Sequence, residues 1–215
     1  MHMPKRFRGH GVRCITGGFL FTVFLTLSAG AIADTPVGTL STDELVAEMQ
    51  KGGLILYVRH AATDHSQADK DLKDLSRCDL QRNLSTQGKE ESRFLAQTLQ
   101  RLNIKAGKVL TSPYCRCVDT AKIAFDRYEI VSGLRATFFT NEAETKELSA
   151  YLRRQLSEVP EDGKNTVLVG HTANLREVTK VWPKPEGVMH VFRPLGEGKG
   201  FTHLGRLPPS QWGEL

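Results

Sequence analysis

Three short apolar runs constrain the fold of this chain more than any other feature of its sequence. Residues 54–58, 109–111 and 167–169 are unbroken stretches of apolar and β-forming residues, and a weaker run follows at residues 129–131. Such runs are typical of strands that are covered on both faces, as in a parallel sheet with helices on either side. Apolar residues at helical spacing separate the runs. The alternation predicts an α/β fold, a three-layer α/β/α sandwich with a mainly parallel sheet.

The C-terminal segment predicts an antiparallel edge hairpin. Residues 190–193 and 201–206 have strand character, and the turn at residues 196–200 is rich in glycine. The Gly-x-Gly-x-Gly spacing of this turn also occurs in nucleotide-binding loops. No helical pattern follows it here, so a hairpin turn is the better interpretation.

Capping residues locate the helices between the strands. Ser41, Ser85 and Ser112 are each placed to cap a helix, and Pro113 after the last of them predicts a helix that starts at the proline. Residues 61–83 show no clean period, and a loop of this length in a compact domain is more often functional than idle. The predicted helices cover residues 45–51, 86–102, 113–125, 142–158 and 173–181, the last capped by Thr172 or Asn174.

The first 33 residues have the pattern of a signal peptide. Four cations precede a short apolar stretch at residues 15–27, and Ala31-Ile32-Ala33 matches a small-residue cleavage site. A membrane anchor is the alternative interpretation, but about 20 apolar residues are needed to span a bilayer, and glycine and serine interrupt this shorter run. We therefore expect one domain at residues 34–215, periplasmic or secreted, with no stable membrane insertion after cleavage.

The basic charge of the chain belongs to this leading segment. The 215 residues carry a formal net charge of +5, but residues 1–33 hold four cations and no anions, so the remaining domain carries +1. A nearly neutral domain does not support a nucleic-acid partner.

Three cysteines remain after the leading segment, in what should be an oxidising compartment. Cys115 and Cys117 are too close in sequence to pair comfortably with each other, so Cys78 is the expected partner of one of them. Of the two possible disulfides we favour Cys78–Cys115.

Charged and nucleophilic residues follow the ends of all three long apolar runs. Arg59 and His60 follow the first run, Arg116 lies in the helix after the second, and His171 follows the third. Ligands of open parallel sheets bind outside the carboxyl ends of the strands. Two of these segments also open helices, where free backbone N–H groups favour an anion. Any one of the residues alone could be structural, but together they predict one anion-binding crevice.

Four motifs in this order resemble the histidine phosphatase superfamily, the group that also contains the cofactor-dependent phosphoglycerate mutases. The similarity covers nearly all of the domain. The matching segments are Tyr57-Val-Arg59-His60-Ala61-Ala62-Thr63 for the Arg-His-Gly motif, Asn83-Leu84-Ser85 with Gly88 for the Leu-Thr/Ser-x-x-Gly helix start, Ser112-Pro113-Tyr-Cys-Arg116-Cys-Val-Asp-Thr120-Ala121 for the Ser-Pro-x-x-Arg-Ala-x-x-Thr-Ala helix, and Val169-Gly170-His171 for the second histidine motif.

The resemblance implies that His60 is the nucleophile, that Arg59 and Arg116 bind phosphate oxygens, and that His171 completes the pocket. Ser66 stands where many relatives carry an asparagine near the phosphate, and its hydroxyl could donate one hydrogen bond. Two nearby guanidiniums should push the pKa of His60 below the reference value of ~6.5, so that it attacks as neutral imidazole. The expected reaction passes through a phosphohistidine and requires no metal and no other cofactor.

The chain departs from the family pattern at the general acid. Ala136 occupies the place of the glutamate in the mutase-like branch, and Thr172 the place of the aspartate in the phytase-like branch. A second departure is Ala61, which replaces the glycine of the first motif, and we expect the turn to survive this change. Without an acid, phosphoryl compounds with good leaving groups become the favoured substrates. The remaining nearby carboxylates are Asp64 and the pair Glu142 and Glu144, of which the pair is better interpreted as a solvated helix start.

The leading prediction is therefore a phosphatase that hydrolyses phosphomonoesters of small phosphorylated substrates. The main alternative is a protein of the same fold that binds a phosphate ligand with weak or no turnover. A mutase is less favoured because export would part it from glycolytic intermediates. Cys115-x-Cys117 together with His60, His65 and His171 could suggest a metal site, but the predicted elements scatter these ligands.

Overall fold

The computed structural model describes residues 40–161, 163–213 and 215. The predicted signal peptide lies outside the described residues, so it stays a prediction. No helix in the described part of the chain is long and apolar enough to cross a membrane.

A six-stranded mixed sheet forms the middle layer, with the strand order β3-β2-β4-β1-β5-β6. The pairs β1·β4, β2·β4 and β2·β3 are parallel, whereas β5 runs antiparallel to both β1 and β6. The prediction of a mainly parallel sheet with a C-terminal antiparallel edge hairpin is thus confirmed. The strands are β1 (Ile55–Arg59), β2 (Ala106–Thr111), β3 (Glu129–Ile130), β4 (Asn165–Gly170), β5 (Met189–Pro194) and β6 (Phe201–Leu207).

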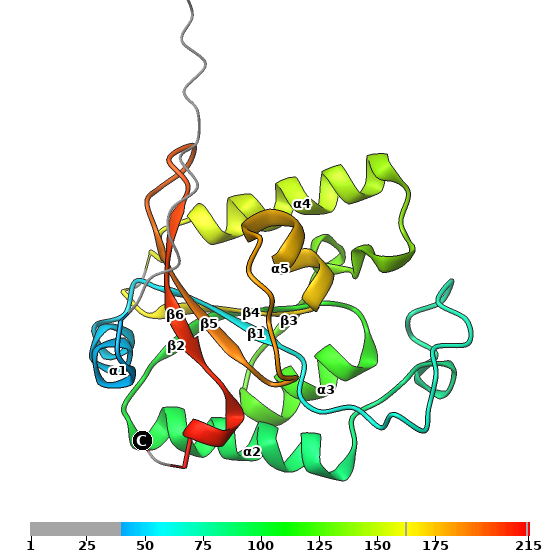
Figure 1. Cartoon of the computed structure of the whole chain (residues 1–215), viewed down its shortest axis with the longest axis horizontal. Helices are drawn as coiled ribbons and strands as arrows, with labels where there is room; N and C mark the ends of the chain where they lie inside the picture. Colours follow the sequence, from blue (N-terminus) through cyan, green and yellow to red (C-terminus); the bar gives the residue numbers. More distant parts are fainter. Residues whose placement is uncertain (1–39, 162, 214) are drawn as a thin grey trace, which may run out of the picture. The chain divides into compact units, whose positions relative to one another are not determined.

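Helices cover both faces of the sheet, and alternate residues of its central strands join the cores on the two sides (Figure 1). In β1, Leu56 and Val58 join the core beneath α1, α2 and α3, while Ile55 and Tyr57 join the core beneath α4 and α5. This alternation is why the run looks uniformly apolar in the sequence. The helices are α1 (Thr42–Lys51), α2 (Thr86–Arg101), α3 (Cys115–Ala124), α4 (Glu142–Ser157) and α5 (Thr172–Thr179).

Two helix predictions need correction. Helix α3 begins at Cys115. Its N-cap residue is Tyr114, whose side chain makes no capping hydrogen bond, so the helix does not start at Pro113 with Ser112 as its N-cap. Helix α5 ends at Thr179 because Lys180 adopts a left-handed conformation, and no side chain caps its start. The Ser41 and Ser85 caps are confirmed, the first with a complete capping box.

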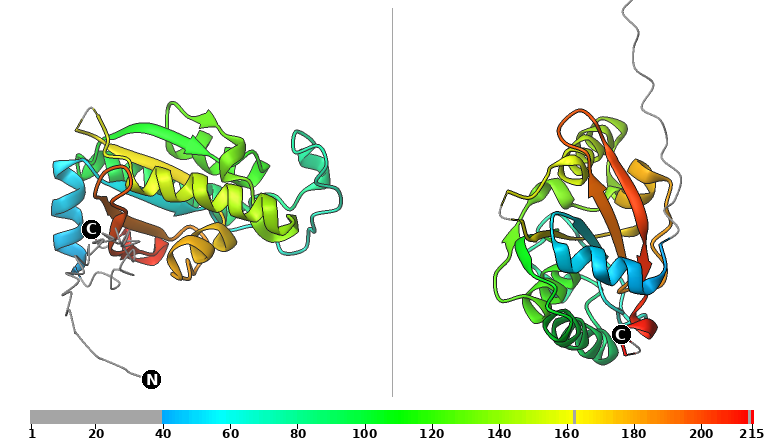
Figure 2. Two further views of the ribbon diagram at one scale, coloured as in Figure 1. Left: turned by 90° about the horizontal axis from the view of Figure 1, so that it is seen from above. Right: turned by 90° about the vertical axis from the view of Figure 1, so that its left-hand side faces the viewer.

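The segment at residues 61–83 is irregular, as predicted, apart from a short 3-10 turn, η1 (Cys78–Leu80), and a bridge between Thr63 and Leu84. In the left view of Figure 2 its turquoise part extends beyond the ends of the strands. On the other side of β1, the residues just before β5 form hydrogen bonds with the end of β1. The backbone N–H of Arg59 donates to the Val188 carbonyl at 3.0 Å, and the Gly187 N–H donates to the His60 carbonyl at 2.9 Å.

Candidate active site

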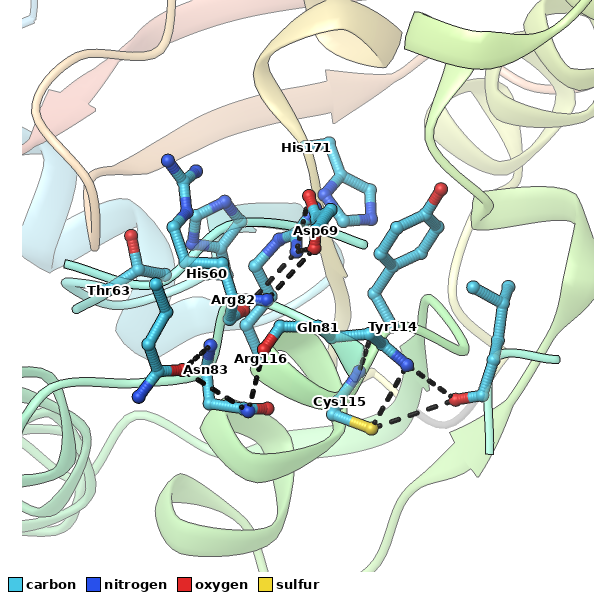
Figure 3. Close-up of polar contacts among 12 residues, drawn as sticks. His60, Thr63, Asp69, Gln81, Arg82, Asn83, Tyr114, Cys115, Arg116 and His171 are labelled. Carbon is cyan, nitrogen blue, oxygen red and sulfur yellow. Dashed lines mark hydrogen bonds and ion pairs between the residues drawn. The ribbon is translucent and has the colours of Figure 1, made fainter. Parts of the chain in front are cut away.

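The ends of three adjacent strands bring the predicted residues together. Strand β4 lies between β1 and β2, so His60, His171 and the start of α3 with Arg116 emerge at one edge of the sheet. The ring centroids of His60 and His171 are 5.6 Å apart. Figure 3 shows these side chains in one cluster with Arg82 and Asp69. The side chains thus come together where the strand pattern predicts them.

His60 is held in one tautomer. Its Nδ1 lies 3.0 Å from the carbonyl oxygen of Ala61, which can only accept, so Nδ1 carries the proton and Nε2 keeps its lone pair. The side chain is buried, and burial, followed by the charge of Arg116, holds the pKa of His60 well below its usual value. At neutral pH the imidazole is uncharged and can act as a nucleophile through Nε2.

The turn after His60 accepts an alanine in place of the motif glycine. Ala61 does not adopt a positive φ, so no glycine conformation is required there. Its backbone N–H donates to the Thr120 hydroxyl at 3.0 Å, and that hydroxyl donates to the Arg116 carbonyl at 2.7 Å. The helix that carries Arg116 is thereby tied directly to the turn that carries the nucleophile.

His171 is fixed on both its backbone and its ring. Its carbonyl accepts from the Tyr57 hydroxyl at 2.7 Å, and its Nε2 lies 2.7 Å from the Ser112 hydroxyl oxygen. The same Ser112 oxygen also accepts from the Tyr114 backbone N–H at 3.4 Å, just before α3 begins. Tyr114 packs edge-on against the ring at 4.8 Å between centroids. Burial and the nearby Arg116 hold the pKa of His171 well below its usual value, so this ring is also neutral.

Arg116 is buried with part of its guanidinium unpartnered. Its Nη1 donates to Asp69 Oδ1 at 3.0 Å and to the Arg82 carbonyl at 3.4 Å. The Tyr114 ring lies under the guanidinium, with the central carbon 4.6 Å from the ring centroid. Its Nε has no hydrogen-bond partner although it is buried. A buried donor without a partner is costly, which marks this edge of the guanidinium as a place for an anionic ligand.

Arg59 also has hydrogen-bond partners for only part of its guanidinium. Its Nη2 donates to Glu186 Oε1 at 3.0 Å and its Nη1 to the Pro183 carbonyl at 3.2 Å, while its buried Nε has no partner. Glu186 is held in turn by the backbone N–H and the hydroxyl of Thr63, at 2.9 and 3.0 Å. The carboxylate fixes the guanidinium and leaves the buried Nε–H without a partner.

Three charged residues at this site were not found by sequence reasoning: Asp69, Arg82 and Glu186. Asp69 and Arg82 lie in the irregular segment at residues 61–83, and Glu186 lies in the turn before β5. Neither segment has a periodic pattern that could place a side chain. The one available signal was the position of Arg82 directly before the Asn83-Leu84-Ser85 motif.

The other predicted residues lie apart from this cluster or in other roles. Ser66 is exposed and its hydroxyl donates to Asp64 at 2.7 Å, so both are engaged in a local turn, and phosphate binding by Ser66 stays a prediction. Glu144 forms the capping box of α4 with Asn141 and also accepts from Arg135 at 2.9 Å. Together with Glu142 it belongs to the acidic first turn of α4, the interpretation that the sequence favoured.

The cysteines follow the favoured prediction. Cys78 and Cys115 form a disulfide, which ties η1 to the first turn of α3. Cys117 is free and buried, and burial raises the pKa of its thiol to about 12, so it stays protonated beside His171. In the part of the chain that the structure describes, no group of three or more histidine, cysteine or carboxylate side chains is arranged to hold a metal ion.

An open groove adjoins the cluster on the Arg59 side. It has a volume of about 1250 Å³ and lies between α2 and the segment before β5, and its lining includes Arg59, Ala62, Glu91, Phe94, Glu186 and Pro209. A group attached to a phosphate at His60 could extend into this space.

Comparison with known proteins agrees with the fold and the motifs. The family model of the histidine phosphatase superfamily (branch 1) matches residues 55–147. The fold is similar to that of the protein histidine phosphatase SixA in complex with tungstate, with 20% identity over 74% of this chain and 98% of that chain and a TM-score of 0.53. It is also similar to the alpha-ribazole phosphatase from Shigella flexneri, with 14% identity over 70% of this chain and 94% of that chain and a TM-score of 0.52. No curated protein sequence matches the chain.

Over residues 55–147 the chain is therefore similar to the histidine phosphatase superfamily, and its fold is similar to that of phosphatases. This similarity supports a phosphatase-type enzyme.

Proposed function

We propose that this protein is a phosphatase that hydrolyses phosphomonoesters through a phosphohistidine on His60. The observation that carries the proposal is the hydrogen bond from Nδ1 to the Ala61 carbonyl, which leaves the Nε2 lone pair beside the guanidinium of Arg116. Depression of the His60 pKa by burial and by that guanidinium keeps the lone pair available at neutral pH.

The reaction consists of two displacements at phosphorus. In the first, His60 Nε2 forms a bond to phosphorus while the bond between phosphorus and the leaving oxygen breaks, and the electron pair goes to that oxygen. In the second, the oxygen of water forms a bond to phosphorus while the bond between phosphorus and Nε2 breaks, and the electron pair of that bond returns to the imidazole. The proton that water loses goes to the released phosphate or to solvent. Arg59 and Arg116 direct their unpartnered Nε–H groups to the phosphate oxygens, whose negative charge is greatest in the transition state. His171, which contacts the Ser112 hydroxyl through Nε2, completes the pocket.

The leaving group determines which substrates are hydrolysed rapidly. The carboxylates that the sequence offered as acids are engaged elsewhere, Asp64 with Ser66 and Glu144 with Asn141 and Arg135. The two carboxylates at the site, Asp69 and Glu186, each form an ion pair with an arginine. Aryl phosphates, anhydrides and phosphoramidates therefore fit the site better than alkyl phosphates. Equal rates on p-nitrophenyl phosphate and an alkyl phosphate would contradict this preference.

The experiment that tests the proposal is capture of the phosphoenzyme. Brief mixing with a labelled aryl phosphate, followed by denaturation in base, should leave an acid-labile label on the wild type and none on His60→Ala. His65→Ala is the matched control, because His65 is an exposed histidine of the neighbouring turn and should retain the label. Tight phosphate binding by the wild type without any adduct would instead support the alternative, a phosphate-binding protein with little or no turnover.

We also propose that the protein acts outside the cytoplasm, in the periplasm or after secretion. The disulfide between Cys78 and Cys115 supports this location, since such bonds persist in oxidising compartments. Sequencing the N-terminus of the native protein tests it: a chain that begins near residue 34 is expected, and an intact N-terminus on a cytoplasmic protein would overturn it.

A further inference from the structure

Arg82 presents a third unpartnered guanidinium donor at the site. Its buried Nε has no hydrogen-bond partner, as in Arg59 and Arg116. The side chain is 29% exposed, and its one ion pair is a long contact of 3.9 Å from Nη2 to Glu186 Oε1. An arginine needed only for structure would be expected to use its five donors on protein acceptors, and this one does not.

The backbone of Arg82 forms hydrogen bonds with Arg116 and with Asp69, the carboxylate that pairs with Arg116. Its N–H donates to Asp69 Oδ1 at 3.0 Å, the same oxygen that accepts from Arg116 Nη1, and its carbonyl accepts from Arg116 Nη1 at 3.4 Å. Figure 3 shows Arg82 in one cluster with His60, Asp69 and Arg116. The backbone atoms thus hold the position of Arg82 relative to Arg116, while the side chain is left with donors to spare.

The segment that carries Arg82 is anchored on its other side as well. Gln81 accepts from the backbone N–H of Cys115 at 3.0 Å and donates to the Leu75 carbonyl at 2.8 Å. The disulfide from Cys78 reaches the same helix turn. A residue held by these three links lies at a fixed place, which is what recognition of a small anion requires.

The charges of the cluster leave room for an anion. Three guanidiniums, of Arg59, Arg82 and Arg116, face two carboxylates, those of Asp69 and Glu186. Both histidines at the site are neutral. The excess positive charge is partly buried, and it is stabilised when an oxyanion enters.

We propose that Arg82 is a third phosphate-binding arginine of this site, held in place by the disulfide-linked segment at residues 61–83. A phosphoryl group in transfer has three equatorial oxygens, and three guanidinium edges around His60 match that number. The inference rests on the phosphate pocket of the proposed function, but it does not require turnover. The depressed pKa of His60 is consistent with it, because Arg82 contributes to that depression.

The test is oxyanion binding by calorimetry, with tungstate and inorganic phosphate as probes. Arg82→Gln should weaken tungstate binding by roughly 10- to 100-fold, as expected for loss of a charge-assisted hydrogen bond. The tungstate affinity of Arg82→Lys should fall between those of the wild type and Arg82→Gln, because lysine keeps the charge and loses the planar guanidinium. Arg77→Gln is the matched control, since Arg77 lies on the same segment, is exposed and pairs with Asp79, and its variant should bind tungstate as the wild type does.

Two further measurements separate ligand binding from folding. Urea denaturation of each variant reports stability, and titration of the His60 ring by NMR should show a higher pKa in Arg82→Gln than in the wild type or Arg77→Gln. Wild-type tungstate affinity in Arg82→Gln would overturn the proposal, as would a loss of affinity that only follows partial unfolding. If the wild type forms no phosphoenzyme but Arg82→Gln still loses tungstate affinity, the role of Arg82 stands and the phosphohistidine reaction fails.

Discussion

Removing the disulfide should destabilise the protein by an amount that follows from the loop it closes. Cys78 and Cys115 are 37 residues apart. Constraining a loop of that length removes roughly 13 cal/mol/K of entropy from the unfolded chain, or about 4 kcal/mol at 25 °C. Cys78→Ser is the better perturbation because Cys78 is exposed whereas Cys115 is buried, so little packing is lost with it.

The assay is urea denaturation of four samples: wild type and Cys78→Ser, each with and without reductant. The oxidised wild type should be the most stable, and the other three should coincide. An oxidised wild type within about 0.5 kcal/mol of Cys78→Ser would refute the reasoning, because a chain-entropy effect of this size cannot be hidden by the loss of one exposed sulfur. Since the disulfide anchors the segment that carries Arg82, Cys78→Ser should also bind tungstate more weakly even where it is fully folded.

Two further predictions concern pH and packing. Four buried histidines have pKa values below the ordinary value, and for two of them, His190 and His203, burial lowers the pKa to about 3 and about 4. The unfolded chain therefore binds more protons below pH ~6.5, and the unfolding free energy should fall as pH decreases from 6.5 toward 4, by up to about 1.4 kcal/mol per pH unit for each histidine; denaturation midpoints that do not change over this range would contradict it. Gly88→Ala should cost about 1–3 kcal/mol, because a Cβ there would lie 1.9 Å from the Ala62 carbonyl oxygen, whereas Gly213→Ala, whose Cβ meets only ordinary contacts, should change thermal stability little.

The strand ends could be predicted because one pattern carries two kinds of information. A fully apolar run such as residues 54–58 identifies a buried strand, and the first polar residues after it must then lie at the sheet edge. This is how His60 and His171 were placed in one crevice. The same logic cannot reach Asp69 or Glu186, because their backbones follow no regular period and their positions depend on partners far along the chain.

The error at the start of α3 has a specific cause. Ser112 before Pro113 is a good local capping pattern, but a hydroxyl oxygen can also pair with a buried imidazole. Here the hydroxyl lies 2.7 Å from His171 Nε2 and accepts from the Tyr114 N–H at 3.4 Å, and the helix begins two residues later than the pattern predicts. The shorter contact of this hydroxyl is the one made with the site.

The place of β1 in the sheet bears on when the site can form as the chain emerges. The strand that presents His60 is paired on one side with β4 and on the other with β5, and it also exchanges hydrogen bonds with Gly187 and Val188, which lie far along the chain from β1. If the chain crosses a membrane with its N-terminus first, as proposed, the nucleophile arrives well before the strand beside it. The pocket would then be complete only after residues 187 and 188 have been delivered, and a chain halted before them would hold its histidine without a working site around it.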